Sequence, residues 1–158
     1  MMTEKLTHID EHGAAKMVDV ADKAITKRSA TASAIIEMQP KTLQLILEGG
    51  LPKGDCIPVA RTAGIMAAKR THDLIPLCHP LALSSVDIVF HACKDNQLEI
   101  KATVRLSGKT GVEMEALTAA SISALTIYDM IKAIEKTAII KETKLVEKLG
   151  GKSGHFKI

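Results

Sequence analysis

The sequence has very few aromatic residues: no tryptophan, one tyrosine and two phenylalanines in 158 residues. Proteins that recognise single-stranded nucleic acid stack bases on exposed aromatic rings, so this scarcity argues against that class. The charge excess is also small, a formal net charge of +3 from acids and bases mixed along the chain. This balance argues against a protein that binds duplex nucleic acid, whereas a small polyanion remains a suitable partner.

Cysteine and long apolar runs are equally scarce. Cys56, Cys78 and Cys93 are odd in number and have no C-x-x-C spacing, so we expect reduced thiols and a cytoplasmic protein. No apolar run approaches the roughly 18 residues that a membrane-spanning helix needs, and we predict no membrane association. The N-terminal stretch MMTEKLTHID has no apolar core of signal-peptide type.

The length and the 46% of hydrophobic residues predict one domain over residues 1–158, with a core built from aliphatic side chains. Residues 1–29 are polar apart from the patch MVDV (17–20), and we interpret them as a loosely held N-terminal arm. The glycine-rich residues 150–158 are expected to form a flexible C-terminal tail.

Hydrophobic periodicity predicts the elements in between. Apolar residues alternate from Ala30 to Met38, which indicates a strand that ends before Pro40. Pro40 then begins a helix that stops at Gly49, and Asp55 can cap a second helix that runs to about residue 71. The two prolines of LIPLCHPLAL (74–83) exclude regular structure there, so a structured loop is expected.

Two further alternating runs, 86–92 and 98–106, flank the turn KDNQ (94–97) and predict a β-hairpin. A long helix over 112–134 and a strand over 137–147 complete the pattern. The order strand, helices, strand, strand, helix, strand is that of an α+β, ferredoxin-like split βαβ fold. We therefore predict an antiparallel sheet with helices packed on one face.

The stretch LTIYDMIKA (125–133) places Asp129 and Lys132 three residues apart in an apolar segment. On a helix they lie within one turn, about 5 Å apart along the axis, and share a face. One interpretation is an ion pair in water, which stabilises a helix only slightly. The other is an acid–base pair in a site, and the local pattern leaves both open.

The same face of this helix carries Glu115, fourteen residues before Asp129, or roughly 21 Å along the axis. One small ligand cannot easily touch both. Either the two ends of the helix have different roles, or a neighbouring subunit brings complementary residues to each. Favourable charge near a helix N-terminus would also explain Glu113 and Glu115.

The remaining polar signals are weaker. In PLCHP (76–80), Cys78 and His79 are held between two prolines. One interpretation is a functional site in a rigid loop, and the other is a histidine with a purely structural role. Adjacent Cys and His are no metal-ligand spacing, and no partner motif supports a nucleophile. The loops SGKTG (107–111) and GKS (151–153) lack the first glycine of a phosphate-binding P-loop, although either can present N–H groups and a lysine to a phosphate.

Three segments closely resemble the molybdenum cofactor biosynthesis protein C family, the cyclic pyranopterin monophosphate synthases. They are KRTHDLIPLCHPL (69–81), GKTGVEMEALTAASISALTIYDMIKA (108–133) and GGKSGHF (150–156). MVDV and KGD (53–55) fit the same family, while His72 stands where an aromatic residue is expected.

The resemblance implies a ferredoxin-like fold assembled as a homohexamer, a trimer of dimers, with active sites between subunits. It also implies a lyase reaction that converts the GTP-derived 3′,8-cyclo-7,8-dihydro-GTP, a cyclic nucleotide triphosphate, to cyclic pyranopterin monophosphate and pyrophosphate. No redox cofactor and no resident metal are implied. Whether a divalent cation accompanies the phosphates stays open.

The resemblance further implies roles for individual residues. Asp129 and Lys132 would be the central catalytic pair, with Lys53 beside them. The substrate would be contacted from the structured loop by Leu77, Cys78 and His79, and its base by Glu113, Met114 and Glu115. Lys69 and Lys152 would bind its phosphates. Ring opening and closure need proton transfers, for which positioned Asp, Lys and His side chains are suitable. Lysines suit the binding of a triphosphate.

The alternative interpretation is a non-catalytic, metabolite-sensing ferredoxin-like module, because a fold alone does not imply catalysis. A sensor has no need of an acid–base pair beside its phosphate lysines, so Asp129 and Lys132 discriminate between the two.

Overall fold

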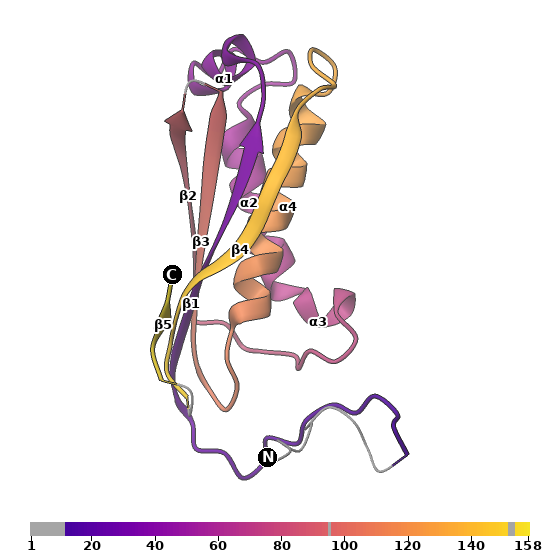
Figure 1. Cartoon of the computed structure of the whole chain (residues 1–158), viewed down its shortest axis with the longest axis vertical. Coiled ribbons are helices and arrows are strands. Elements are labelled where there is room, and N and C mark those ends of the chain that lie inside the picture. Colours follow the sequence, from indigo (N-terminus) through magenta and orange to yellow (C-terminus); the bar gives the residue numbers. More distant parts are fainter. Residues whose placement is uncertain (1–11, 95, 152–153) are drawn as a thin grey trace, which may run out of the picture.

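The computed structural model describes residues 12–94, 96–151 and 154–158. The elements in chain order are β1 (Thr26–Glu37), α1 (Pro40–Leu47), α2 (Cys56–Lys69), α3 (Thr71–Leu74), β2 (Ser85–Lys94), β3 (Gln97–Gly108), α4 (Glu113–Ile131), β4 (Ile139–Leu149) and β5 (Phe156–Lys157). The strands form one antiparallel sheet in the order β2-β3-β1-β4-β5, and the helices cover one of its faces (Figure 1). The predicted α+β, ferredoxin-like split βαβ arrangement is confirmed.

The central strand β1 presents small side chains to the helices. Ala30, Ala32, Ala34 and Ile36 are all buried, and they alternate with residues on the opposite face. Ala32 lies opposite Ala102 of β3 and Leu145 of β4. Because alanine occupies little volume, α4 packs closely across the middle of the sheet, against β1, β3 and β4.

The two long helices α2 and α4 also meet through small side chains. Ser123 is fully buried and its hydroxyl donates to the carbonyl of Ala60 at 3.0 Å. Gly64 lies directly against Ser123 and Ile88, with no room for a side chain. This packing holds α4 along most of the length of the molecule (Figure 1).

Three expectations about boundaries need correction. Strand β1 begins at Thr26, so the end of the expected arm (1–29) belongs to the sheet. The second helix ends at Lys69, and α3 is a separate turn of helix. At the other terminus, β5 pairs with β4 through Glu147 and Lys148, so the end of the expected tail is a strand. Residues 1–11 and 152–153 lie outside the described residues.

Within the described ranges, no helix combines the length and the hydropathy that crossing a membrane requires.

The packing at Gly64 predicts the effect of one methyl group. A Cβ there would clash with Ser123 and Ile88 and would lie 2.9 Å from the carbonyl oxygen of Ala119, a backbone atom that cannot move aside. Overpacking of this kind costs about 1–3 kcal/mol, against about 1 kcal/mol gained from alanine's helix propensity. Gly64→Ala should therefore lower the unfolding free energy measured in urea. Gly50→Ala is the control, because its nearest neighbour is the flexible Leu45 side chain at 3.3 Å; equal stability of the two variants would contradict the packing argument.

Candidate functional site

Most of the sequence-predicted site residues lie near the two ends of α4. The structured loop after α3 and the N-terminal arm lie near the end where the helix begins, and the turn before α2 lies near the end where it stops (Figure 1). Each end has its own group of polar side chains.

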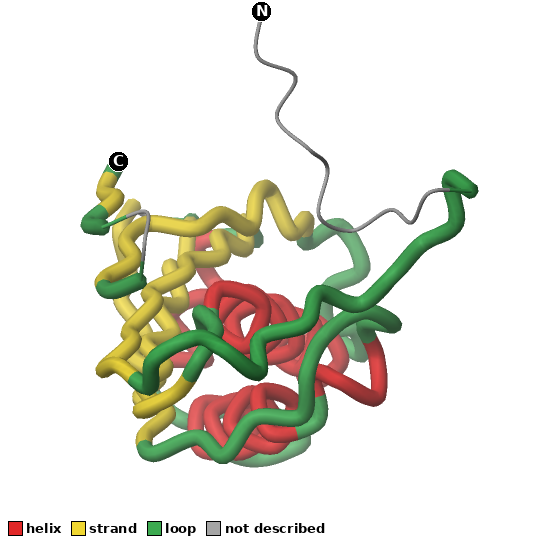
Figure 2. Tube along the Cα trace, turned by 90° about the horizontal axis from the view of Figure 1, so that it is seen from below, coloured by secondary structure: helices red, strands yellow, loops and turns green. Residues whose placement is uncertain are grey.

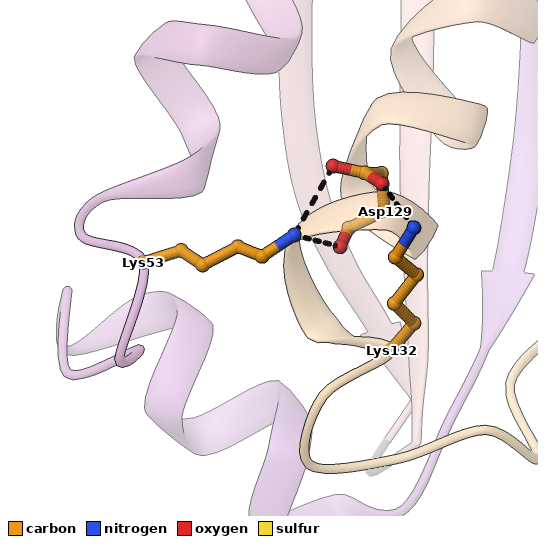
Figure 3. A network of polar contacts seen from close by, with 3 residues as sticks. All are labelled: Lys53, Asp129 and Lys132. Carbon is orange, nitrogen blue, oxygen red and sulfur yellow. Dashed lines mark hydrogen bonds and ion pairs between the residues drawn. The ribbon is translucent and has the colours of Figure 1, made fainter.

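At the C-terminal end of α4, Asp129 is contacted by two lysines (Figure 3). Lys132, one turn further along, places its ammonium 2.8 Å from one carboxylate oxygen. Lys53 places its ammonium 3.3 Å from the other oxygen, and also donates to the Asp129 backbone carbonyl at 2.9 Å. The three residues form a cluster with two positive charges and one negative charge.

The chain segment that carries Lys53 is held on both sides. Gly54 adopts a φ of +88°, a conformation that glycine adopts without strain, and its N–H donates to the carbonyl of Leu51 at 2.9 Å. Asp55 then caps α2 by accepting from the N–H of Ile57 at 3.1 Å. This turn and cap direct Lys53 toward the end of α4.

The charged forms of Asp129 and Lys132 are stabilised by their contacts with each other and with Lys53, and both side chains remain exposed to solvent. Hydrogen bonds from Lys132 and Lys53 lower the pKa of Asp129, and the Asp129 carboxylate raises the pKa of Lys132. Both side chains of the Asp129–Lys132 pair are about half exposed, at 55% and 53%, so the pair adds little to folding stability. An intrahelical ion pair alone does not account for the arrangement, because Lys53 arrives from 76 residues away.

At the N-terminal end of α4, a cavity of about 280 Å³ brings together the six residues expected to contact substrate. Three come from the structured loop and three from the first turn of the helix: Leu77, Cys78 and His79; Glu113, Met114 and Glu115. The sequence pattern had separated these triplets by more than thirty positions, and the fold places them around one space.

The surroundings of this cavity favour the neutral forms of the Glu115 carboxyl and the Cys78 thiol. Glu115 is only 4% exposed, and burial, with a smaller contribution from the nearby Glu113 charge, raises its pKa. Burial and the Glu115 charge likewise raise the pKa of the Cys78 thiol. A thiol that stays protonated is a poor nucleophile, so Cys78 suits contact with a ligand better than covalent catalysis.

The N-terminal arm forms one wall of the same cavity. Val18, Val20 and Lys23 line it, and a ring nitrogen of His79 lies 2.9 Å from the carbonyl oxygen of Val18. Figure 2, seen from this end of the molecule, shows loops crossing in front of the helices. The interpretation of residues 1–29 as a loosely held arm missed this contact, although MVDV was its one apolar signal.

A second cavity of about 850 Å³ adjoins the first and shares four of its lining residues: Lys23, Thr110, Gly111 and Glu113. Arg28 on β1, Lys109 in the loop before α4 and Lys148 on β4 add three cations to it. Lys148 pairs with Glu113 at 3.3 Å, and so links the two cavities.

Sequence reasoning did not identify Arg28 or Lys148 as site residues. The available signal was the alternation of side chains between the two faces of a strand. Arg28 is two residues before the buried Ala30 and four before Ala32, so it lies on the apolar, helix-facing side of β1. Lys148 lies opposite Ala30 and shares that side. A charged residue at a core-facing strand position is a reason to suspect a site.

Lys69 is the one expected site residue, among those that the structure describes, that joins neither group. Lys69 is an exposed residue at the end of α2 and is not among the described residues that line the two cavities. Lys152 lies outside the described residues. In the part of the chain that the structure describes, no group of three or more His, Cys, Asp or Glu residues could hold a metal ion.

Comparison with known families adds one finding. A family model described as the MoaC family matches residues 17–151, a span that includes both ends of α4, the structured loop and the MVDV patch.

The raised pKa of Glu115 predicts how stability depends on pH. Because its folded pKa lies above the unfolded value, the folded state binds an extra proton between the two, and stability falls as pH rises through that window. Glu115→Gln removes this titration. Its melting temperature should exceed that of the wild type at neutral pH, and the difference should vanish below about pH 4, where an unfolded glutamate is also protonated.

Melting curves between acidic and neutral pH measure this difference. Glu48→Gln, at an exposed carboxylate, is the control. A Glu115→Gln protein that is less stable than the wild type at pH 7 would contradict a costly buried carboxylate.

Proposed function

Because the chain belongs to the MoaC family, the molybdenum cofactor biosynthesis protein C family, we propose that it is a cyclic pyranopterin monophosphate synthase. The proposed reaction converts 3′,8-cyclo-7,8-dihydro-GTP to cyclic pyranopterin monophosphate and releases pyrophosphate, which makes the protein a lyase. The observation that carries the proposal is the grouping of Leu77–His79 and Glu113–Glu115 around one cavity, since these are the family motifs expected to hold substrate.

Asp129, Lys132 and Lys53 are assigned the proton transfers of ring opening and closure. Lys132 is assigned the first proton donation, because its ammonium is held in place 2.8 Å from the Asp129 carboxylate. Lys53 adds a second positive charge that an anionic transition state can use. The net positive charge of this cluster favours a negatively charged substrate.

The cavity at the start of α4 is assigned the base of the substrate. Carboxylate oxygens accept hydrogen bonds from ring and amino N–H groups, and Glu113 is held for that purpose by Lys148. Gly111 packs directly on the Glu113 carboxylate, where a Cβ would clash with it. Met114 and Leu77 supply apolar contact at the partly exposed rim.

We assign each complete site to two subunits of a homohexamer. The two residue groups lie at opposite ends of a helix of 19 residues, too far apart for one substrate in one chain. Leu125, between the two ends on the same face of α4, is 54% exposed in the single chain. A neighbouring subunit that covers this face can bring its own Asp129 cluster to the base-binding cavity.

The direct test is to incubate the protein with the cyclic GTP derivative and measure pyrophosphate. We expect Asp129→Asn and Lys132→Ala each to lower turnover about a hundredfold or more, the usual scale for a positioned acid or base. Lys136→Ala, a nearby exposed lysine, is the matched control. Near-normal turnover in either cluster variant would refute its catalytic role, and substrate binding without turnover by the wild type would favour a sensing module.

Subunit sharing predicts complementation. Asp129→Ala damages one residue group and Glu115→Ala the other, so each variant should be inactive alone. Mixed assemblies contain some interfaces with one intact group from each chain, and part of the activity should return. Mass spectrometry verifies that subunits have exchanged; a fully exchanged mixture that stays inactive argues that each site lies within one chain.

A further inference from the structure

Glu135 is a buried acid that the proposed mechanism does not use. It follows Lys132 in the turn after α4, and only 6% of it is exposed. Both of its carboxylate oxygens accept from the backbone N–H of Gln39, each at 3.1 Å, and one of them also accepts from the hydroxyl of Thr137 at 3.0 Å. A buried carboxylate is costly unless hydrogen bonds compensate for the lost water, so these contacts determine where the side chain lies.

Gln39 is the N-cap residue of α1, a helix that lacks the usual capping groups. In the described structure its N-cap makes no side-chain hydrogen bond, and its first turn contains no acidic residue. Glu135 places a carboxylate at this end of α1, where the helix dipole favours a negative charge. An acid from 96 positions away therefore takes the place of a local cap.

The two chain segments that Glu135 joins meet a second time at the Asp129 cluster. Gln39 and Lys53 lie at the two ends of the segment that contains α1, while Asp129 and Glu135 lie on either side of the end of α4. Lys53 donates to Asp129, and Gln39 donates to Glu135. Both α1 and the C-terminal end of α4 lie at the same end of the molecule (Figure 1). The two segments are thus connected at both of their ends.

The segment from Gln39 to Lys53 is packed as one unit. Its helix has only 8 residues, too few to be stable by itself, so its position depends on the groups that it contacts. Leu43, Ile46 and Leu51 are all buried in the core, which leaves little loose chain between the two ends of the segment. A shift at the first residue is therefore passed on toward Lys53.

We propose that Glu135 is a positioning residue of the active site, which holds Lys53 against the Asp129–Lys132 pair by fixing the segment that carries it (Figure 3). The proposal rests on the proposed function, which gives these three residues the proton transfers. Glu135 acts through Gln39 and α1, and needs no contact with the substrate. Since a misplacement of about 1 Å can cost about a hundredfold in rate, a small displacement of Lys53 is enough to matter.

The first test is an NMR titration of the Asp129 carboxyl in the full-length protein, with isotopically labelled aspartate and Asp129→Asn for assignment. Hydrogen bonds from Lys132 and Lys53 lower the pKa of Asp129, so Lys53→Ala should raise that pKa toward its ordinary value. Glu135→Ala should raise it too, whereas Glu135→Gln, which keeps an acceptor for Gln39, should preserve most of the lowering. In a Lys53→Ala background, Glu135→Ala should add nothing, because the residue through which it acts is gone.

Turnover of the cyclic GTP derivative is the second readout. Glu135→Ala should lower kcat about tenfold or more and leave KM nearly unchanged, because Lys53 is assigned to the chemical step. Thr31→Ala is the control for a purely structural loss. It removes a hydroxyl–hydroxyl bond of 2.9 Å to Thr103 on the sheet face away from the helices. This control should lower the melting temperature while kcat and the pKa of Asp129 stay unchanged.

A wild-type Asp129 pKa in Glu135→Ala would overturn the proposal. So would an equal rise with and without Lys53, or a raised pKa with unchanged kcat in an active protein. If Glu135→Ala fails to fold, Gln39→Pro decides in the same way, because it removes the donor N–H at a φ of −66°, the value that proline requires. An Asp129 pKa that depends on Glu135 through Lys53, in a protein without turnover, would sustain the positioning role and refute the proposed reaction.

Discussion

The close packing of α4 against β1 and α2 is the constraint on which the rest of the structure depends. Alanines on β1 and the contact of Gly64 with Ser123 let the helix lie near both neighbours, so its path is set by backbone sterics rather than by adaptable side chains. A helix held this firmly places its two ends at fixed positions. The smaller cavity and the Asp129 cluster are both built at those ends, and an error in helix packing would displace both.

Charge is distributed along α4 in the sense that its dipole favours. The acidic Glu113 and Glu115 lie in the first turn of α4, and Lys132 lies at its C-terminal end. Lys53 reaches the same end from the turn before α2 and donates to the backbone carbonyl of Asp129. Favourable helix-dipole interactions and the proposed chemical roles therefore fall on the same residues, although burial makes the Glu115 charge costly. They differ in burial: Glu115 is 4% exposed and Asp129 is about half exposed. The buried acid costs stability at neutral pH, whereas the exposed cluster is available to a ligand or to a neighbouring subunit.

Chain segments distant in sequence complete the site around this helix. The arm contributes Val18 and Val20 to the smaller cavity, next to its contact with His79, and β1 contributes Arg28 to the larger one. Glu135 has a supporting role: its buried carboxylate accepts from the N–H of Gln39 at 3.1 Å, which ties the start of α1 to the segment after α4. The end of α4 is in this way connected to the helix layer on two sides, by Lys53 and by Glu135.

The sequence by itself determined the elements and the local pairs. Alternation specified β1, β2 and β3, the two prolines specified the loop at 74–83, and the spacing of Asp129 and Lys132 specified a shared face, because each depends on neighbours within a few residues. Strand β1 begins at Thr26 rather than at Ala30, and β5 forms inside the segment predicted as a flexible tail, because pairing with distant strands extends one and creates the other. Only the tertiary structure decided that Lys53 meets Asp129, that the arm forms one wall of the smaller cavity, and that Arg28 meets Lys109. Those contacts join residues between 61 and 81 positions apart, and no local periodicity encodes which distant segments the folded sheet and helices bring together.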